Sequence, residues 1–402
     1  MKFETPGLRP EHELLLQCAR VELSSAHRER IAALLEQPLS WELLHRRANL
    51  HGLTSLVYRH LGSMASAACP ASLWRTWGQQ SLGILANNLR LVAELSSLGK
   101  LFRESSIPFL CLKGPALTGL IYGDLRLRPS CDLDLLVRPA DARRACELFV
   151  RRGFVAQFEL AGQCWETFLQ IRSELTFRRE NPCGLAELHW GLLSPGYSFT
   201  PSVEACWDRA ESVCVESASV LTLGLEDNLL FLCLHASKHD WQRLIWLVDL
   251  AELLRQRAGV DWDRVLTPAN VRSAGRQIQV SLLLASRLLE APVPPDVWRR
   301  LPPDGQAERI VQRVLRDQLF ARHPDRNSVH TPPWRKLHFQ AMRSRRDRFR
   351  YVYEVLLQPT PVEWQLWPLP SWLAPAYHVL RPIRLLWRQL LRWLRIPRTG
   401  RA

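Results

Sequence analysis

Apolar residues recur at three- and four-residue spacing along several segments near the N-terminus. This spacing is typical of amphipathic helices, whose buried side chains share one face. It predicts helices over Glu11–Arg20, His27–Leu35, Trp41–His51 and Leu82–Phe102. Pro70 interrupts the pattern, and we expect it to separate two helices.

The pattern changes at Ile107, where short apolar runs and alternating positions replace the helical spacing. Such runs indicate strands, whereas a proline just inside a segment suits the start of a helix. The predicted strands are Ile107–Leu112, Asp132–Val137, Phe154–Phe158, Glu174–Arg178 and Leu185–Trp190. The predicted helices between them are Pro115–Tyr122 and Pro139–Arg152.

Helical periodicity returns from Leu225 to about Leu301, with Asp249 inside a strongly apolar segment. Proline-rich stretches at 292–303 and 332–333 mark boundaries. We therefore expect an α+β fold in which a compact core is flanked by N- and C-terminal helical regions. The expected divisions are a helical region at 1–81, the α/β core at 82–193, a helical domain at 194–330 and a basic segment at 331–402.

The composition is that of a folded protein, since 47% of the 402 residues are hydrophobic and 23% are charged. Residues 1–12 lack the apolar stretch of a signal peptide, and no run of about eighteen apolar residues is present to span a membrane. The ten cysteines lie between Cys18 and Cys233 without a CxxC pair. We expect reduced, mostly buried thiols in a cytoplasmic protein, rather than a disulfide framework or a zinc site.

The net charge of +14 is concentrated near the C-terminus. The stretch from Trp334 to Ala402 holds thirteen Arg and one Lys against three acids. Within it, His378–Arg395 has the pattern of a basic amphipathic helix, although Pro382 weakens its start. Three interpretations remain open: a helix docked on the protein with its arginines in water, a peripheral contact with the inner face of an anionic membrane, and a nucleic-acid contact.

Asp132 and Asp134 are the most informative acidic residues, because they stand two positions apart on a predicted strand. Residues at i and i+2 of a strand project from the same face, so both carboxylates can reach the same cations. Mg²⁺ prefers carboxylate oxygens, and a pair of such ions clamps the attacking and leaving oxygens of phosphoryl transfer. An acidic pair alone is also common on a solvated strand edge, so the surrounding residues decide between the two interpretations.

A third carboxylate from a neighbouring strand usually completes such a metal site. Glu187 is the preferred candidate, because it follows the strand pattern at a suitable distance along the chain. Glu174, on the preceding predicted strand, is the alternative. Glu187 is also a candidate to take a proton from an acceptor hydroxyl.

Lys113-Gly114 forms the predicted turn between a strand and a helix upstream of the acidic pair. A glycine amide can approach a phosphate closely, and lysine is rare in this chain, with five against 48 arginines. Lys113 suits a β- or γ-phosphate, and the alternative is a surface lysine that caps the turn. Arg126 and Arg128 are further candidates for binding a triphosphate, unless one of them pairs with Asp124.

His235 and His239 are four residues apart on a predicted helix, a spacing compatible with a shared metal. Two histidines without further ligands favour a structural role, or contact of His239 with the cleft. Asp249 is expected to satisfy a buried partner, and Cys131 is expected in the core. The chain lacks GxSxG, GxGxxG and Walker sequences, which argues against the enzymes and nucleotide-binding folds that carry them.

Together these residues resemble the uncharacterised bacterial nucleotidyltransferase family within the DNA polymerase β-like superfamily. The resemblance covers about residues 40–255. The matching positions are Lys113-Gly114, Tyr122, Arg128, the Asp132–Val137 block, Glu187-Leu188-His189-Trp190, Leu234-His235, His239, Trp241 and Trp246–Asp249.

The resemblance implies a polymerase β-like core with a mixed β-sheet, an NTP donor and two Mg²⁺ ions. The implied metal ligands are Asp132, Asp134 and Glu187, and the implied nucleotide-binding residues are Lys113, Gly114 and Arg128. The wider superfamily has a Gly-Ser turn where this chain has Lys-Gly. The implied reaction transfers a nucleoside monophosphate from the NTP to an acceptor that the sequence does not identify, with release of pyrophosphate.

Two alternatives remain beside this expectation. One is a non-catalytic nucleotide-binding or scaffold protein that retains the fold, against which the three acids argue. The other is a toxin-like nucleotidyltransferase that uses the same acids to modify RNA or protein.

Overall fold

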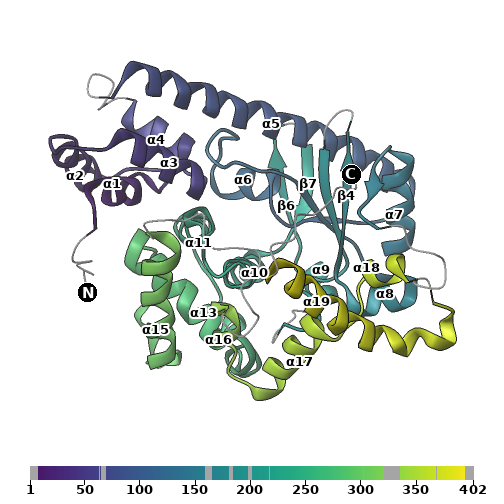
Figure 1. The fold of residues 1–402 in the computed structure, drawn as a ribbon. Coiled ribbons are helices and arrows are strands. Elements are labelled where there is room, and N and C mark those ends of the chain that lie inside the picture. Colours follow the sequence, from purple (N-terminus) through teal and green to yellow (C-terminus); the bar gives the residue numbers. More distant parts are fainter. Residues whose placement is uncertain are drawn as a thin grey trace.

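The computed structural model shows a β-sheet held between helical regions from both ends of the chain (Figure 1). It describes residues 8–62, 64, 69–158, 165–180, 184–197, 202–216, 218–301, 303–320, 336–367 and 369–393. Within these ranges, no helix is both long enough and apolar enough to cross a membrane.

The N-terminal region folds into the helices α1 Pro10–Cys18, α2 Ser25–Leu35, α3 Trp41–His51 and α4 Thr54–Leu61. The prediction for α3 is confirmed at both ends. Ser40 caps its N-terminus, and Gly52 ends it in a left-handed conformation with φ 72°. The hydrophobic spacing did not predict α4, which is only eight residues long.

A long helix, α5 Ala71–Glu104, links the N-terminal region to the sheet. It begins earlier than the predicted Leu82–Phe102. The additional turns pack on α4, where the ring of Trp74 lies 4.6 Å from that of Tyr58. The expected division between residues 81 and 82 lies inside α5, and the division into domains stays a prediction.

Five strands of the described residues form one mixed sheet in the order β1-β2-β5-β4-β3. They are β1 Leu110–Cys111, β2 Leu133–Leu136, β3 Val155–Ala156, β4 Glu174–Arg179 and β5 Gly184–His189. Strands β2 and β5 are parallel, and the other neighbours are antiparallel. The predicted strands are confirmed, but those over Ile107–Leu112 and Phe154–Phe158 are much shorter than expected. Both are edge strands of this sheet, which pair on one side only.

The connections within the sheet also differ in detail from the prediction. Asp132 immediately precedes β2 instead of beginning it. The predicted helix Pro139–Arg152 starts as a 3₁₀ turn at Pro139–Asp141 and continues as α7 Ala142–Arg151. The other helices of this part are α6 Pro115–Ile121 and α8 Trp165–Ile171.

One face of the sheet packs on an apolar core and the other carries the acidic residues, because alternate residues of a strand point to opposite sides. Leu133 and Leu135 of β2 pack with Phe102 of α5 and Phe149 of α7 in one hydrophobic core. Asp134 therefore projects from the opposite face. That face lies towards α10 Leu225–Lys238, whose residues line the same pocket as Asp134.

An antiparallel hairpin that the sequence pattern did not predict follows the main sheet. Its strands are β6 Glu211–Val215 and β7 Ala218–Thr222, and the helix α9 Val203–Asp208 precedes it. The hydroxyl of Thr222 donates to the carbonyl of Cys111 at 2.7 Å, which ties the hairpin to β1. The sequence signal for β6 is the alternation of Val213 and Val215 with Ser212 and Cys214, which the sequence analysis did not use.

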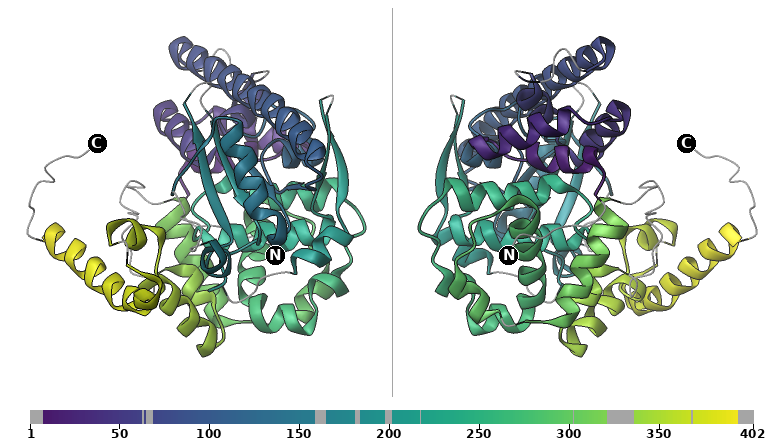
Figure 2. Two further views of the ribbon diagram at one scale, coloured as in Figure 1. Left: turned by 90° about the vertical axis from the view of Figure 1, so that its right-hand side faces the viewer. Right: turned by 90° about the vertical axis from the view of Figure 1, so that its left-hand side faces the viewer.

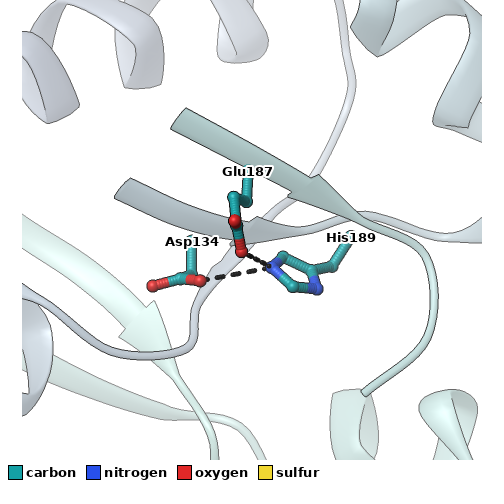
Figure 3. A group of neighbouring side chains, drawn as sticks. All are labelled: Asp134, Glu187 and His189. Carbon is teal, nitrogen blue, oxygen red and sulfur yellow. Dashed lines mark hydrogen bonds and ion pairs between the residues drawn. The ribbon is translucent and has the colours of Figure 1, made fainter. Parts of the chain in front are cut away.

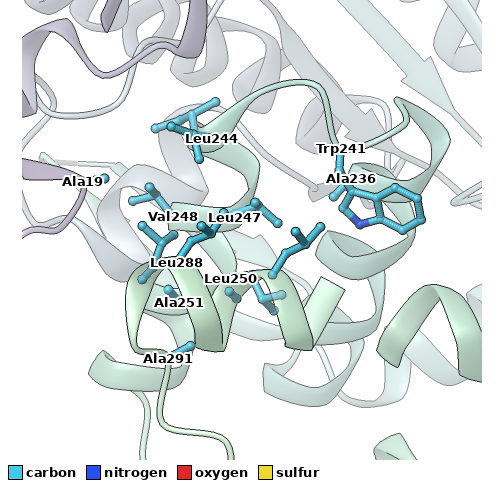
Figure 4. Close-up of a cluster of buried hydrophobic side chains, with 14 of the residues drawn as sticks. Ala19, Ala236, Trp241, Leu244, Leu247, Val248, Leu250, Ala251, Leu288 and Ala291 are labelled. Carbon is cyan, nitrogen blue, oxygen red and sulfur yellow. The ribbon is translucent and has the colours of Figure 1, made fainter. Parts of the chain in front are cut away.

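The predicted helical stretch from Leu225 to Leu301 is confirmed and begins with α10, whereas the hairpin β6–β7 lies inside the range 194–330 that was predicted as a helical domain. The further elements of the helical domain are α11 Leu244–Gln256, α12 Trp262–Val265, α13 Pro268–Leu289, α14 Pro295–Arg300, α15 Gly305–Arg313 and a π-helical turn Val314–Leu319. Figure 4 shows its core, where Leu247 and Val248 of α11 lie near Leu288 of α13 and Ala19 of the N-terminal region. One hydrophobic core therefore joins the N-terminal region to the helical domain.

The segment that we call the C-terminal lobe comprises residues 336–393. It contains α16 Leu337–Ala341, α17 Arg345–Leu356, α18 Pro361–Leu366, a 3₁₀ segment Ser371–Ala376 and α19 Tyr377–Trp393. Figure 2 shows α19 at one side of the molecule. The predicted helix His378–Arg395 is confirmed as far as Trp393, and its last two residues lie outside the described ranges.

Helix α19 is docked on the lobe, as one interpretation expected, but the prediction that its arginines lie in water is wrong for Arg381 and Arg384. Leu386 and Leu390 are exposed, whereas Arg381 and Arg384 form ion pairs with Glu363, whose side chain is completely buried. The arginines of this helix therefore include the residues that hold it to the lobe.

Candidate active site

Acidic and histidine side chains converge on the polar face of the sheet. Asp134 on β2 pairs in register with Glu187 on β5, and Leu136 pairs with His189. Glu174 on the neighbouring strand β4 pairs with His189. Because alternate residues of a strand share a face, Asp134, Glu187 and His189 come together in space (Figure 3).

His189 lies at the centre of this group. Its Nε2 is 3.2 Å from Oδ1 of Asp134 and 3.5 Å from Oε2 of Glu187, and its Nδ1 is 3.4 Å from Oε2 of Glu174. Burial lowers the pKa of His189, but the hydrogen bonds to Asp134 and Glu187 outweigh burial and raise the pKa to about 9. The imidazole therefore links the carboxylates of Asp134, Glu187 and Glu174.

Lys113 points into the same group from the turn between β1 and α6. Its Nζ is 3.1 Å from Oδ1 of Asp134 and 3.3 Å from Nε2 of His235. Burial opposes its charge, but the carboxylates of Asp134 and Asp132 outweigh burial and raise the pKa of Lys113. With 16% of its side chain exposed, Lys113 is part of the pocket wall, and the alternative of a surface lysine is wrong.

Gly114 has backbone angles that suit glycine alone, with φ 61° and ψ −132°. A Cβ at this position would lie 3.1 Å from the carbonyl oxygen of Asp132. Glycine therefore lets the Lys-Gly turn lie directly against the residue that begins the acidic pair.

The carboxylates repel one another strongly. Burial opposes the charge of Asp134, but Lys113 and His189 hold its pKa well below the ordinary value. Burial and the charge of Asp134 raise the pKa of Asp132 to about 6, against the opposite effect of Lys113. Asp132 and Asp134 therefore repel each other, and a cation bound between them would relieve that repulsion.

A pocket of about 460 Å³ opens over this group. Its size is in the range of small-ligand sites. The sheet contributes Asp132, Asp134, Glu174, Glu187 and His189 to its lining. Basic side chains and histidines line it as well: Lys113, Arg128, His235, Lys238, His239 and Arg243. The expected contact of His239 with the cleft is thereby confirmed.

The loop between α10 and α11 holds the basic side of the pocket. Asp240 and Trp241 are successive non-glycine residues in the left-handed region, with φ 53° and 51°. The completely buried Trp241 donates from Nε1 to the hydroxyl of Ser281 at 2.8 Å, and the backbone amide of His338 donates to Asp240 at 2.9 Å. Packing thus maintains a costly backbone conformation beside the pocket, as is common at functional sites.

Lys238 and Arg243 flank that loop, and the sequence analysis did not select them as site residues. Lys238 contacts Glu174 across the pocket at 3.5 Å, and Arg243 donates from Nε to the carbonyl of Leu50 at 3.0 Å. The available signal was composition, because Lys113 and Lys238 are two of only five lysines in the chain.

His189 was also not selected, although it follows Glu187 at the two-residue spacing that places both on one face. The prediction that Cys131 lies in the core is wrong. Cys131 precedes β2, is exposed and lines the pocket.

Arg128 and Asp249 form a buried ion pair. Nε and Nη2 of Arg128 donate to the two carboxylate oxygens of Asp249 at 2.8 and 2.9 Å, and the hydroxyl of Tyr122 donates to Asp249 at 2.7 Å. The expected buried partner of Asp249 is thereby confirmed. Of the two arginines that were considered, Arg126 is the one that pairs with Asp124.

The residues present fit a divalent cation. Asp134, Glu187 and His189 each offer one ligand atom, and these atoms lie within 4.8 Å of one another. Oδ2 of Asp134 is buried and accepts no hydrogen bond from the described part of the chain. A buried carboxylate oxygen without a donor is costly unless a cation or water satisfies it. Asp132 and Glu174 both line the pocket but lie outside this group of ligand atoms.

Comparison with known proteins agrees with the geometry of the pocket. No curated protein and no solved structure matches the chain. A family match covers residues 37–290, which include the sheet, the pocket and most of the helical domain. The chain belongs to this family, which is described as uncharacterised nucleotidyltransferase.

Proposed function

We propose that this chain is a divalent-cation-dependent nucleotidyltransferase that transfers a nucleoside monophosphate from an NTP to an acceptor. The acceptor oxygen attacks the α-phosphorus, the bond to the bridging oxygen of the β-phosphate breaks, and pyrophosphate leaves. The observation on which the proposal rests is the buried Oδ2 of Asp134, which has no donor in the described residues, on a side chain whose carboxylate is grouped with ligand atoms of Glu187 and His189. Membership of the family supports nucleotidyl transfer as the reaction class.

Asp132, Asp134 and Glu187 are the proposed ligands of two Mg²⁺ ions, because carboxylate oxygens suit this cation. When bound, such ions stabilise the charge that develops on the reacting phosphate and orient its oxygens. His189 holds Asp134 and Glu187 in place through its Nε2. Glu187 is also the proposed acceptor of the proton that the attacking hydroxyl loses.

The basic lining of the pocket is the proposed site of the triphosphate. Lys113 and the amide of Gly114 lie on the sheet side, and Lys238 and Arg243 lie on the helical side. Ammonium and guanidinium groups both suit phosphate oxygens. We propose that Arg128 contributes its positive charge from the pocket wall while Asp249 holds it in position.

The mixed sheet supports a place for the core in the DNA polymerase β-like superfamily. An acidic pair precedes and begins β2, and a third acid lies on its parallel neighbour β5. Because NTPs are substrates inside cells, the proposal includes a cytoplasmic location.

The test is incubation of the purified chain with NTPs radiolabelled at the α-phosphate, Mg²⁺ and a cell extract. We expect label to move to an acceptor, and EDTA to prevent the transfer. Asp132→Ala and Asp134→Ala should each lower the rate at least about 100-fold, since charge stabilisation at a reacting phosphate is worth several kcal/mol. Asp263→Ala is the control, because this side chain is 93% exposed and lies outside the pocket.

Separation of the labelled products distinguishes the alternatives. Label in RNA or protein fractions favours the toxin-like activity, and label in small molecules favours a metabolite acceptor. Transfer that persists unchanged in both alanine variants would contradict the mechanism. Binding of NTP without any transfer would favour the non-catalytic alternative.

A further inference from the structure

The C-terminal lobe leaves a row of large apolar side chains in water. Along α19, Val379, Ile383, Leu386, Trp387 and Leu390 recur at three- and four-residue spacing and are each 50–71% exposed. A soluble protein rarely keeps a contiguous apolar face of this kind without a partner. The row therefore indicates a binding surface.

The surface continues from α19 onto α18 and the segment after it. Leu366 and Trp367 line an apolar groove of about 730 Å³ together with the outer side chains of α19. Trp372, in the 3₁₀ segment that follows, is 76% exposed. Tryptophan is enriched where an apolar phase meets water, because its ring is apolar and its N–H is polar.

The inner face of α19 is held by specific polar contacts. Arg381 and Arg384 pair with Glu363, and Nη2 of Arg381 donates to the carbonyl of Val355 at 2.7 Å. These bonds fix the rotation of the helix about its axis. The apolar row is therefore held outward, and its exposure follows from these internal contacts.

The neighbouring helix α17 presents a basic and aromatic face. Arg345, Arg346 and Phe349 are exposed, and Tyr353 follows four residues after Phe349. The ring of Tyr353 stacks on His378 of α19 with 6.0 Å between centroids, so the two helices meet at the residue that precedes Val379. Positive charge and exposed apolar groups thus occur together in this lobe.

We propose that the C-terminal lobe binds peripherally to an anionic phospholipid bilayer, with the outer face of α19 in the lipid–water interface. Amphipathic helices bind in this way through apolar burial and attraction to anionic headgroups. The sequence from Trp334 to Ala402 supplies the complementary charge, with fourteen basic residues against three acids. Each basic residue near such a surface adds to the attraction.

The apolar row distinguishes this partner from nucleic acid. Phosphate backbones are bound by Lys and Arg, whereas aliphatic side chains such as Ile, Leu and Val make no electrostatic contact with phosphate. A bilayer binds both features of the lobe, because the outward apolar side chains enter its interface and the positive charge attracts its anionic headgroups. The proposal concerns a surface outside the catalytic pocket, so it does not depend on the proposed reaction.

The test is co-sedimentation of the full chain with vesicles of phosphatidylcholine alone or of phosphatidylcholine with phosphatidylserine. We expect binding to the anionic vesicles, weakened by added salt. The double variant Leu386→Glu/Trp387→Glu should bind at least about tenfold more weakly, because two apolar side chains no longer enter the interface. Both residues are exposed, so the folded chain tolerates the change.

The matched control is Leu82→Glu/Val150→Glu, which adds the same charge at residues that are 64% and 57% exposed on α5 and α7. It should bind vesicles as the parent chain does, apart from the small effect of net charge. Equal binding by the two double variants would overturn the proposal. So would binding to RNA or DNA but to neither vesicle, or self-association that the α19 variant removes without any vesicle binding.

Discussion

Asp134 and Glu187 are direct register partners on the parallel strands β2 and β5. Their register is fixed from the other side of the sheet, where Leu133 and Leu135 are buried in the apolar core. A slip of one residue would turn Asp134 into that core and the leucines into the pocket. The apolar packing therefore sets the distance between the two carboxylates.

Gly114→Ala should damage both the fold and the reaction. The added Cβ meets the carbonyl of Asp132 at 3.1 Å, and φ 61° strains any other residue. We expect a loss of about 1–3 kcal/mol in the free energy of unfolding. Because the backbone of Asp132 must move, kcat should fall at least about tenfold, as small misplacements of reacting groups are costly.

Gly123→Ala is the matched control for this glycine. It has a similar φ of 67°, but a Cβ there meets nothing within 4 Å. Urea unfolding should show a smaller loss of stability for Gly123→Ala, which has the strain of a positive φ without the close contact, and only the Gly114 variant should lose activity. Equal activity of the two variants would contradict the proposed contact between the turn and the acidic pair.

Lys238→Met and Arg243→Met should each weaken NTP binding. A hydrogen bond to a charged group is worth about 1.5–3 kcal/mol, so KM for the NTP should rise by roughly ten- to a hundredfold. We expect kcat to change much less, because both side chains lie on the helical side of the pocket. Initial rates over a range of NTP concentrations separate the two constants.

Lys100→Met is the control for these cationic residues, since Lys100 is 75% exposed on α5. Its KM should equal that of the parent chain. If Lys238→Met and Arg243→Met also leave KM unchanged, the triphosphate lies elsewhere in the pocket.

The part of the site that could be predicted from sequence is the part encoded by local pattern. Asp132, Asp134 and Glu187 stand out because strand periodicity places them on faces and edges of predicted strands. The two basic residues on the helical side of the pocket, Lys238 and Arg243, could not be predicted in this way. Lys238 and Arg243 reach the pocket because the bond from Trp241 to Ser281 holds their loop, and this contact joins residues 40 positions apart.

The same holds for the fold: elements with a local sequence signal were predicted, and contacts between residues far apart in the sequence were not. Helix α3 was predicted at both ends from the spacing of its apolar residues, which is a local signal. The pairing of Arg128 with Asp249 spans 121 positions, and nothing in the spacing of either residue indicates it. Edge strands β1 and β3 were predicted too long, because apolar runs do not reveal where a pairing partner ends.

Removing either member of the Arg128–Asp249 pair should destabilise the fold. Arg128→Met leaves a buried carboxylate without its cation, which costs about 3–5 kcal/mol in the free energy of unfolding. The double variant Arg128→Met/Asp249→Leu should lose less than the sum of the single variants, because no charge is left unpaired. Urea unfolding of the parent and the three variants measures this coupling. A coupling near zero would show that the pair does not act as a unit.

Acid should weaken the contribution of Asp304 to stability. Burial opposes the charge of this residue, but Arg276 and the amides of Gln306 and Ala307 outweigh burial and lower its pKa to about 2. The pKa of an unfolded Asp is about 3.9, so the folded state holds the proton less tightly. Ionised Asp304 therefore stabilises the fold above about pH 4 by roughly 2 kcal/mol, and this stability is lost as the pH falls through 2.

The measurement is urea unfolding of the parent chain and Asp304→Asn at several pH values. The difference between them should be largest at pH 7 and shrink steadily below pH 4. Asp263→Asn is the control, because its side chain is 93% exposed and should show little difference at any pH. A difference for Asp304 that is independent of pH would contradict the assigned pKa.

The most direct test of the account is the binding of Mn²⁺, as a paramagnetic substitute for Mg²⁺, followed by the loss of the free-ion resonance signal. The parent chain should bind Mn²⁺, and Asp134→Asn and Glu187→Gln should each lose that binding. Glu174→Gln should retain it, because Glu174 lines the same pocket but lies outside the group of ligand atoms. Equal affinity for Mn²⁺ in the parent chain and Asp134→Asn would contradict the metal site on which the proposed function depends.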